Sequence, residues 1–183
     1  MIHWLVLTGG ASSRFGHDKS LADLGGRSLV ALACDAAQST ASAQRVTVVG
    51  RERSGGPAAA VVSTLRDVDC DFVGVLAVDM PFVSEVLGAV TAATQLDATN
   101  GAVDAWVPVD SDGRMQWLCA VYRRDALLAA ARDVPDWDGA PFHRLVGGLT
   151  TSHVPIASSV SLLDIDTPDD FERARHLVEG IGN

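Results

Sequence analysis

Aromatic residues, cysteines and long apolar segments are all scarce in this chain of 183 residues. Aromatic residues make up only 5% of it, so a core has to be built from Val, Leu and Ala, which suits a parallel sheet covered by Ala-rich helices. The three cysteines, Cys34, Cys70 and Cys119, lie far apart and form no CxxC pair, which argues against a disulfide scaffold or a zinc site. We interpret them as reduced, buried thiols of a cytoplasmic protein.

Membrane signals and positive charge are also missing. No apolar run approaches the roughly 18 residues of a membrane span, and no basic segment precedes a long apolar stretch at the N-terminus. We therefore expect a soluble cytoplasmic protein without membrane contact. Lys and Arg number 14 against 23 Asp and Glu, a net charge of −9, which disfavours a nucleic-acid partner. A phosphate ligand remains compatible with this balance, because local groups decide its binding.

What the sequence does contain is an alternation of strand and helix signals. Strands are expected over 2–7, 45–50, 72–78, 103–109, 114–122 and 153–156. Helices are expected over 27–39, from Gly55-Gly56-Pro57 onward, and over 83–93, 124–132, 141–146 and 168–179. This alternation predicts an α/β fold with a doubly wound, mainly parallel sheet and helices on both faces. No linker or repeat divides it, so we expect one domain over residues 1–183.

A loop rich in glycine follows the first strand, over residues 8–19. Its spacing matches neither GxGxxG nor the P-loop. Small residues would let the backbone approach a ligand, while Arg14 and Lys19 could neutralise a polyphosphate. The alternative is a surface turn with solvated charges, but the position after a buried first strand favours a phosphate site.

Three aspartates lie where ligands of α/β sheets bind, beyond strand ends. Asp79 follows the apolar strand 72–78 and could hold Mg²⁺ through its oxygens, or simply cap the next turn. Asp164 and Asp166 flank Ile165, so in an extended segment both could face one way and complete a metal site. Their alternative role is to favour the dipole of the helix that follows.

Five segments together resemble the nucleotidyltransferases related to molybdenum cofactor guanylyltransferase. They occur in the order of that family and span nearly the whole chain: the loop Leu7–Lys19, Gly56-Pro57, Val78–Phe82, Trp117–Arg123 and Asp164–Asp170. The resemblance implies a Rossmann-like fold and Mg²⁺-dependent transfer of GMP from GTP to molybdopterin, with pyrophosphate released. Maturation proteins of molybdoenzymes are a further class of partner that it suggests.

The resemblance also implies roles for individual residues. The implied nucleotide contacts are Leu7, Thr8, Gly9, Gly10, Ala11, Lys19 and Asp79. Arg14 and Lys19 would act in catalysis by offsetting charge on the phosphates. Asp79 would hold magnesium, with Asp164 and Asp166 as further candidate ligands. These two aspartates stand where the family usually has asparagines, which would make the metal site more anionic.

Other functions remain open. The segment 50–55 is short and lacks the Asn and Asp that the family uses around guanosine. A cytidylyltransferase or a sugar-phosphate nucleotidyltransferase on the same scaffold is therefore an alternative. A non-catalytic nucleotide-binding adaptor of molybdoenzyme maturation is another. A plain α/β domain without a nucleotide site would require the glycine loop and Asp79 to be coincidental.

Overall fold

The sheet at the centre of the molecule is mainly parallel, as expected. The computed structural model describes residues 1–9, 18–50, 55–99, 101–132, 134 and 136–181. Within them, the main sheet has the order β4-β1-β5-β7-β6-β8. Its strands are β1 (Ile2–Leu7), β4 (Ala43–Val49), β5 (Phe72–Ala77), β6 (Ala105–Val109), β7 (Cys119–Arg123) and β8 (Thr151–Pro155). β7 runs antiparallel to both of its neighbours, so β1, β4, β5, β6 and β8 all end at one edge.

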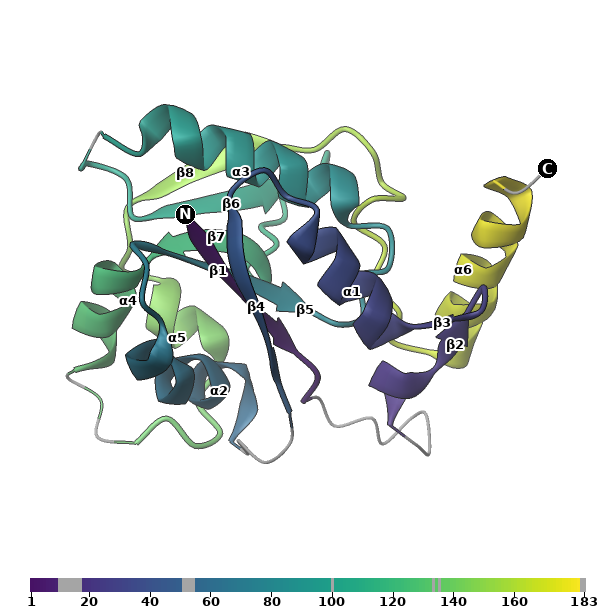
Figure 1. Ribbon diagram of the computed structural model, residues 1–183, viewed down its shortest axis with the longest axis horizontal. Helices are drawn as coiled ribbons and strands as arrows, with labels where there is room; N and C mark the ends of the chain where they lie inside the picture. The colour runs from purple at the N-terminus through teal and green to yellow at the C-terminus, as the bar shows by residue number, and fades with distance from the viewer. Residues whose placement is uncertain (10–17, 51–54, 100, 133, 135, 182–183) are drawn as a thin grey trace.

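Helices cover both faces of this sheet (Figure 1). They are α1 (Leu29–Gln38), α2 (Gly56–Thr64), α3 (Ser84–Asp97), α4 (Arg124–Ala131), α5 (Phe142–Val146) and α6 (Pro168–Ile181). Side chains alternate along β1, so Trp4 and Val6 join the core under α1 and α3, while Leu5 and Leu7 join the core under α2, α4 and α5. The predicted Rossmann-like, doubly wound architecture is confirmed.

One glycine makes close packing in the sheet possible. Trp4 in β1 lies beside Gly74 in β5, and a Cβ atom at Gly74 would lie 2.2 Å from the Trp4 ring. The Trp4 side chain is fully buried, and its indole N–H donates to Thr40 Oγ1 at 3.1 Å. A strand glycine here serves the close approach of an aromatic ring.

The expected strand over 114–122 was wrong in its first half. β7 begins only at Cys119, and Met115 forms an isolated bridge with Val109. The reason lies in the turn that precedes it, because Asp110 Oδ1 accepts the N–H groups of both Asp112 and Arg114 at 2.9 Å. A side chain that satisfies the local backbone in this way competes with the strand ladder.

A short hairpin was not expected from the sequence. β2 (Asp23–Leu24) pairs antiparallel with β3 (Arg27–Ser28), and β3 occupies the first two residues of the segment where a helix over 27–39 was predicted. That helix starts later, at Leu29, because Ser28 is its N-cap and accepts from Ala31 N–H. The hairpin packs against α6 at one side of the molecule (Figure 1).

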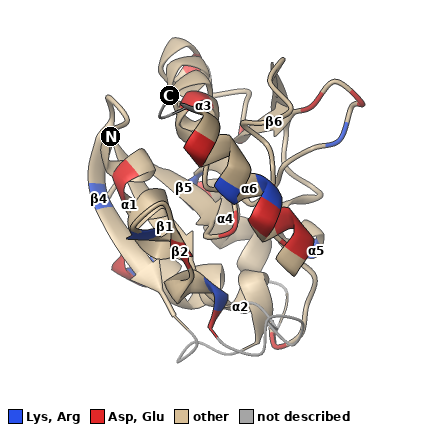
Figure 2. Ribbon diagram, turned by 90° about the vertical axis from the view of Figure 1, so that its right-hand side faces the viewer, with Lys and Arg blue, Asp and Glu red and all other residues tan. Residues whose placement is uncertain are grey.

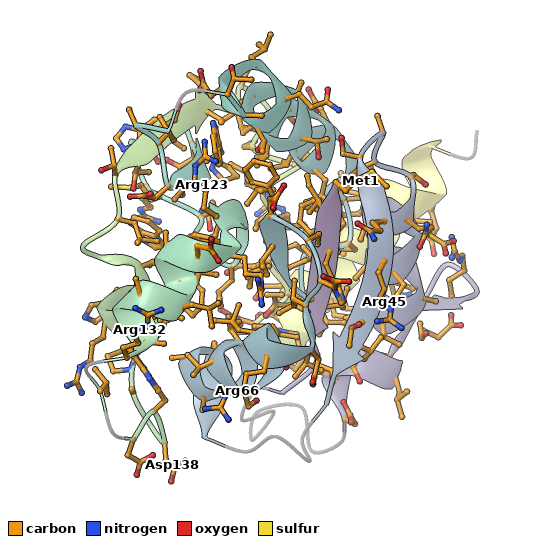
Figure 3. The ribbon with its side chains drawn as sticks, turned by 60° about the vertical axis from the view of Figure 1, so that its left-hand side comes forward. Met1, Arg45, Arg66, Arg123, Arg132 and Asp138 are labelled. Atoms are coloured by element: carbon orange, nitrogen blue, oxygen red, sulfur yellow. The ribbon has the colours of Figure 1, made fainter. Side chains whose placement is uncertain are left out.

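Arg123 lies at the end of the sheet where the parallel strands begin, paired with Phe72. Figure 3 shows Arg123 in the upper part of the molecule and Asp138 at its lower end. The Arg123 guanidinium stacks over the rings of Phe72 and Trp106, at 5.3 and 5.5 Å from their centroids, and covers these rings where the parallel strands begin.

In the described part of the chain, no helix is long and apolar enough to cross a membrane.

Candidate functional site

Segments from three distant parts of the chain meet where the parallel strands end. Lys19 Nζ lies 3.2 Å from Asp79 Oδ2 and 3.5 Å from Asp166 Oδ1. We call these three residues the Lys19 cluster. The side chain of Lys19 is only 12% exposed, whereas that of Asp166 is 62% exposed, so the cluster opens to solvent on the Asp166 side. The topology favours this convergence, because parallel strands deliver their following loops to one edge.

Lys19 reaches the cluster from a short 3₁₀ helix, η1 (Lys19–Leu21). Asp18 caps this helix, since its Oδ1 accepts from the Ser20 N–H at 3.0 Å and from the Ser20 hydroxyl at 2.7 Å. Lys19 is also the only lysine in the sequence. Its ammonium is therefore the single lysine point charge that the protein can place on a phosphate.

Backbone hydrogen bonds hold Asp79 in place from two sides. The Val78 N–H donates to Leu7 O at 3.1 Å, which ties the end of β5 to the end of β1. The Ile165 N–H donates to Asp79 O at 2.9 Å, which ties the C-terminal segment to the same point. The carboxylate is thus presented by a fixed backbone, and it is partly accessible, with 28% of the side chain exposed.

The segment that carries Asp166 is fixed by a reciprocal helix cap. Thr167 Oγ1 accepts from the Asp170 N–H at 3.2 Å, while Asp170 Oδ2 accepts from the Thr167 N–H at 2.8 Å and from its hydroxyl at 2.7 Å. The hydrogen bond from the Thr167 side chain, above all, lowers the pKa of Asp170. The cap begins α6 where the sequence predicted, and it leaves Asp164 and Asp166 before the first turn.

The carboxylates of this edge influence one another electrostatically. Loss of hydration and the charge of Asp166, followed by the charges of Asp79 and Asp170, raise the pKa of Asp164. A surplus of negative charge therefore remains around the Lys19 cluster. Mg²⁺ prefers hard oxygen ligands such as carboxylates. Between Asp79 and Asp166, the Lys19 ammonium occupies the position that such a cation could take.

The expected three-aspartate metal site is not assembled in the described residues. Among them, no three His, Cys, Asp or Glu side chains are grouped closely enough to hold a metal ion. Asp79 and Asp166 share a cationic neighbour, whereas Asp164 is linked to them only through its charge. Asp79 and Asp166 are thus the two predicted ligands that converge, and their binding of a metal stays a prediction.

The end of β1 uses its polar groups within the protein. The Thr8 N–H donates to Val49 O at 3.1 Å, and its hydroxyl donates to the same oxygen at 3.3 Å. Leu7 is buried, and Gly9 is exposed with open space where a Cβ would stand. Gly9 is therefore the first backbone position here that a ligand can approach. The predicted contacts of Gly10, Ala11 and Arg14 lie outside the described residues.

A contact at the start of α2 was missed by the sequence reasoning. Gly55 has φ 107°, and its carbonyl accepts from the Gly139 N–H at 2.9 Å. A Cβ at Gly55 would lie 2.6 Å from Asp138 Oδ1, so only glycine fits beneath this carboxylate. The turn that carries Asp138 is anchored by the buried Trp137. Nothing in the sequence linked residues 55 and 138.

A polar pocket of about 220 Å³ lies at the ends of β6 and β8. One wall is the turn after β6, which Figure 2 shows projecting beside that strand and carrying charges of both signs. The other wall comes from the segment that follows β8 and reaches Asp164. The strands expected over 103–109 and 114–122 leave a turn between them, but the sequence gave no reason to assign that turn to a site.

A known protein family and a named relative are both similar to this chain. Residues 4–146 match the family described as the MobA-like NTP transferase domain. A protein of Bacillus cereus named "Probable molybdenum cofactor guanylyltransferase" is 28% identical over 145 residues, which cover 67% of this chain and 69% of that protein.

Solved structures share the fold across nearly the whole chain. Molybdopterin-guanine dinucleotide biosynthesis protein A of Archaeoglobus fulgidus has a TM-score of 0.72 at 20% identity, covering 97% of this chain and 99% of its own. The 2-C-methyl-D-erythritol 4-phosphate cytidylyltransferase of Thermus thermophilus has a TM-score of 0.65 at 18% identity, covering 96% and 98%. The fold is thus shared with proteins named for different nucleotides.

Proposed function

The chain belongs to the family of MobA-like NTP transferases, and from that premise we propose that it transfers GMP from GTP to molybdopterin and releases pyrophosphate. Membership makes it a nucleotidyltransferase by family. The proposal goes beyond the family in two respects, the guanine base of the nucleotide and molybdopterin as the acceptor. They are supported by the resemblance of the sequence motifs and by the name of the Bacillus cereus relative.

The observation that carries the proposal is the Lys19 cluster. A single lysine lies between two carboxylates at the end of parallel strands, next to the loop that resembles the family's nucleotide loop. A triphosphate with a divalent cation can replace these ion pairs, because the phosphates would take the ammonium and the cation would take the carboxylates. The same groups would then bind both halves of a metal nucleotide.

The reaction needs positioning and charge stabilisation more than covalent help. An oxygen of the acceptor's terminal phosphate would attack the α-phosphorus of GTP in line. The bond from that phosphorus to the oxygen bridging to the β-phosphate breaks, and pyrophosphate leaves with the electron pair. Lys19 would neutralise charge on the departing phosphates, and Arg14 is proposed to assist it.

Asp79 and Asp166 are the residues that would hold Mg²⁺. When bound, the ion would offset charge on the phosphate oxygens. Asp79 would orient it, because the Val78 N–H donates to Leu7 O at the end of β1 and the Ile165 N–H donates to Asp79 O, which fixes the backbone at this residue. Asp166 is exposed and would complete the donor set from the solvent side.

The test compares nucleotides and acceptors separately. Thermal shifts are measured with GTP, CTP, UTP and ATP in the presence of Mg²⁺, followed by pyrophosphate release with molybdopterin as acceptor. The proposal expects the largest shift with GTP and release that requires the acceptor. A largest shift with CTP or UTP would replace the guanylyl assignment. A GTP shift without any pyrophosphate release would identify a non-catalytic nucleotide-binding adaptor instead.

A further inference from the structure

The pocket at the ends of β6 and β8, which we call the β6–β8 pocket, lies at the same sheet edge as the Lys19 cluster. β6 and β8 run parallel to β5, since β7 reverses direction between them. In the sheet order, β1 and β4 lie on one side of β5, and β6 and β8 lie on the other. The nucleotide loop follows β1, so the β6–β8 pocket lies across Asp79 from it. In open α/β sheets, ligands bind beyond strand ends of this kind.

A short piece of chain connects this pocket to the Lys19 cluster. Asp164 lines the pocket, and Asp166, two residues further on, contacts Lys19. Two residues of extended chain span at most roughly 7 Å. A ligand in the β6–β8 pocket can therefore place an attached phosphate at the Lys19 cluster without a long linker.

The charge of the pocket excludes phosphate as its own occupant. Among its described lining residues are three carboxylates, Asp110, Asp112 and Asp164, against the one guanidinium of Arg114. The surplus negative charge repels an anion, whereas carboxylate oxygens accept strongly from N–H and O–H donors. The part of a ligand that enters must be neutral or cationic and rich in donors.

The turn that forms one wall of the pocket is held by hydrogen bonds, and the lining is partly apolar. Asp110 is locked because its Oδ1 accepts two backbone N–H groups of its own turn, and the Gln116 N–H donates to Pro108 O at 2.9 Å. Ile156 and Leu162 contribute buried apolar side chains to the lining. A flat heterocycle can rest on such side chains and turn its polar edge toward the carboxylates.

We propose that the β6–β8 pocket binds the ring of the acceptor through a pterin's aminopyrimidinone edge, whose adjacent N–H groups donate to Asp112 and Asp164. The proposal rests on the proposed function for the identity of the acceptor. It divides the acceptor between two places: the ring lies in the anionic pocket, and the terminal phosphate lies at the Lys19 cluster. The cluster alone would then not select the acceptor.

The experiment titrates the full chain with 6-hydroxymethylpterin, which carries no phosphate, and follows the pterin's fluorescence in buffer with EDTA. Saturable binding is expected. Asp112→Asn and Asp164→Asn each remove one charged acceptor at nearly constant volume and should raise Kd about tenfold. Asp125→Asn is the matched control, because Asp125 is an exposed carboxylate on α4 and is not among the described residues that line the pocket.

The outcomes separate this inference from the proposed function. Each variant is also tested for its GTP-dependent thermal shift, which Asp112→Asn should leave unchanged. Saturable pterin binding that both pocket variants weaken supports the inference even if GTP proves to be the wrong nucleotide. Absent pterin binding, or weakening by Asp125→Asn to the same extent, overturns it. Tighter binding of glucose, which like the pterin probe carries no phosphate, also overturns it, in favour of a sugar-phosphate acceptor.

Discussion

The Lys19 cluster and the β6–β8 pocket both contain more carboxylates than cations, but only in the cluster does a nearly buried cation pair with two of the carboxylates. In the cluster, a lysine that is nearly buried lies between Asp79 and Asp166. In the pocket, three carboxylates face a single arginine. The cluster can exchange its own ion pairs for those of a metal nucleotide, whereas pocket carboxylates that lack such a central cation recognise hydrogen-bond donors. The difference assigns the phosphate chemistry to one region and the selection of the acceptor to the other.

One segment joins these two regions. Asp164 and Asp166 stand on either side of Ile165, whose N–H donates to Asp79 O. The register of three residues therefore decides which carboxylate faces the pocket and which faces Lys19. Changes in one region should leave the other intact, and changes in this segment should disturb both.

The largest effect is expected from Asp79→Asn. The substitution keeps the size of the side chain but removes the charge that pairs with Lys19 and would hold the cation. Turnover with GTP and acceptor should fall about 100-fold or more, as is typical when a preorganised electrostatic group is lost. Pterin binding in the β6–β8 pocket should not change. Turnover is measured by pyrophosphate release, and circular dichroism checks the fold.

The same measurements can contradict this assignment. Normal turnover in Asp79→Asn would remove Asp79 from the machinery. A matched loss in Asp125→Asn would show that the effect is a general one of charge. If Asp79→Asn weakened pterin binding as strongly as Asp164→Asn, the two regions would not be independent.

Lys19→Met should have the next largest effect, because it removes the cation that pairs with the carboxylates of the cluster. Without the ammonium, Asp79 and Asp166 keep their negative charge with no cation between them. The Kd for GTP should rise about tenfold or more, since a charge-assisted contact to phosphate is lost. Isothermal titration measures the affinity, and Lys19→Arg should recover part of it because the charge is retained. Unchanged GTP affinity in Lys19→Met would contradict a phosphate role for Lys19.

Much of this architecture could be predicted from local signals. Ile2–Leu7 and Phe72–Ala77 are apolar runs of strand length, so β1 and β5 were predicted to within a residue. Asp79 stands directly after such a run, which places it at the strand-end edge of the sheet. Lys19 was predicted from its position in the glycine loop. These residues could be found because each is adjacent in sequence to an element with a strong pattern.

The β6–β8 pocket could not be predicted in this way. It exists because β8 pairs with β6 over more than forty residues of sequence, with Pro155 beside Val109. Its turn wall depends on Asp110, whose side chain accepts from the backbone of its own turn and replaces the first half of the strand predicted over 114–122. The carboxylate over Gly55 likewise comes from residue 138. Non-local pairing and side-chain competition for the backbone leave no periodic signal.

The smallest effect, and the sharpest test of the joining segment, is expected from Thr167→Ala. The substitution removes the oxygen that accepts from the Asp170 N–H and the hydroxyl that donates to Asp170 Oδ2. Loss of such an N-cap costs about 1 kcal/mol of unfolding free energy. Because the cap sets the register of Asp164 and Asp166, modest losses of both GTP affinity and pterin affinity should accompany it. A loss confined to one ligand would contradict the role of this segment as the joint.

The cap also predicts a pH dependence of stability with a definite sign. The hydrogen bond from Thr167 lowers the pKa of Asp170 in the folded protein below its usual value of 3.8. The folded state then binds fewer protons than the unfolded state, so this contribution is fully present above pH 3.8 and is lost as the pH falls through the folded pKa. Urea unfolding of the native chain and of Thr167→Ala at a series of acidic pH values measures it. The stability difference between the two should shrink toward low pH, because protonated Asp170 no longer accepts the hydrogen bond as a charged group. A difference that stays constant with pH would show that Thr167 acts through its hydrogen bond to the backbone alone.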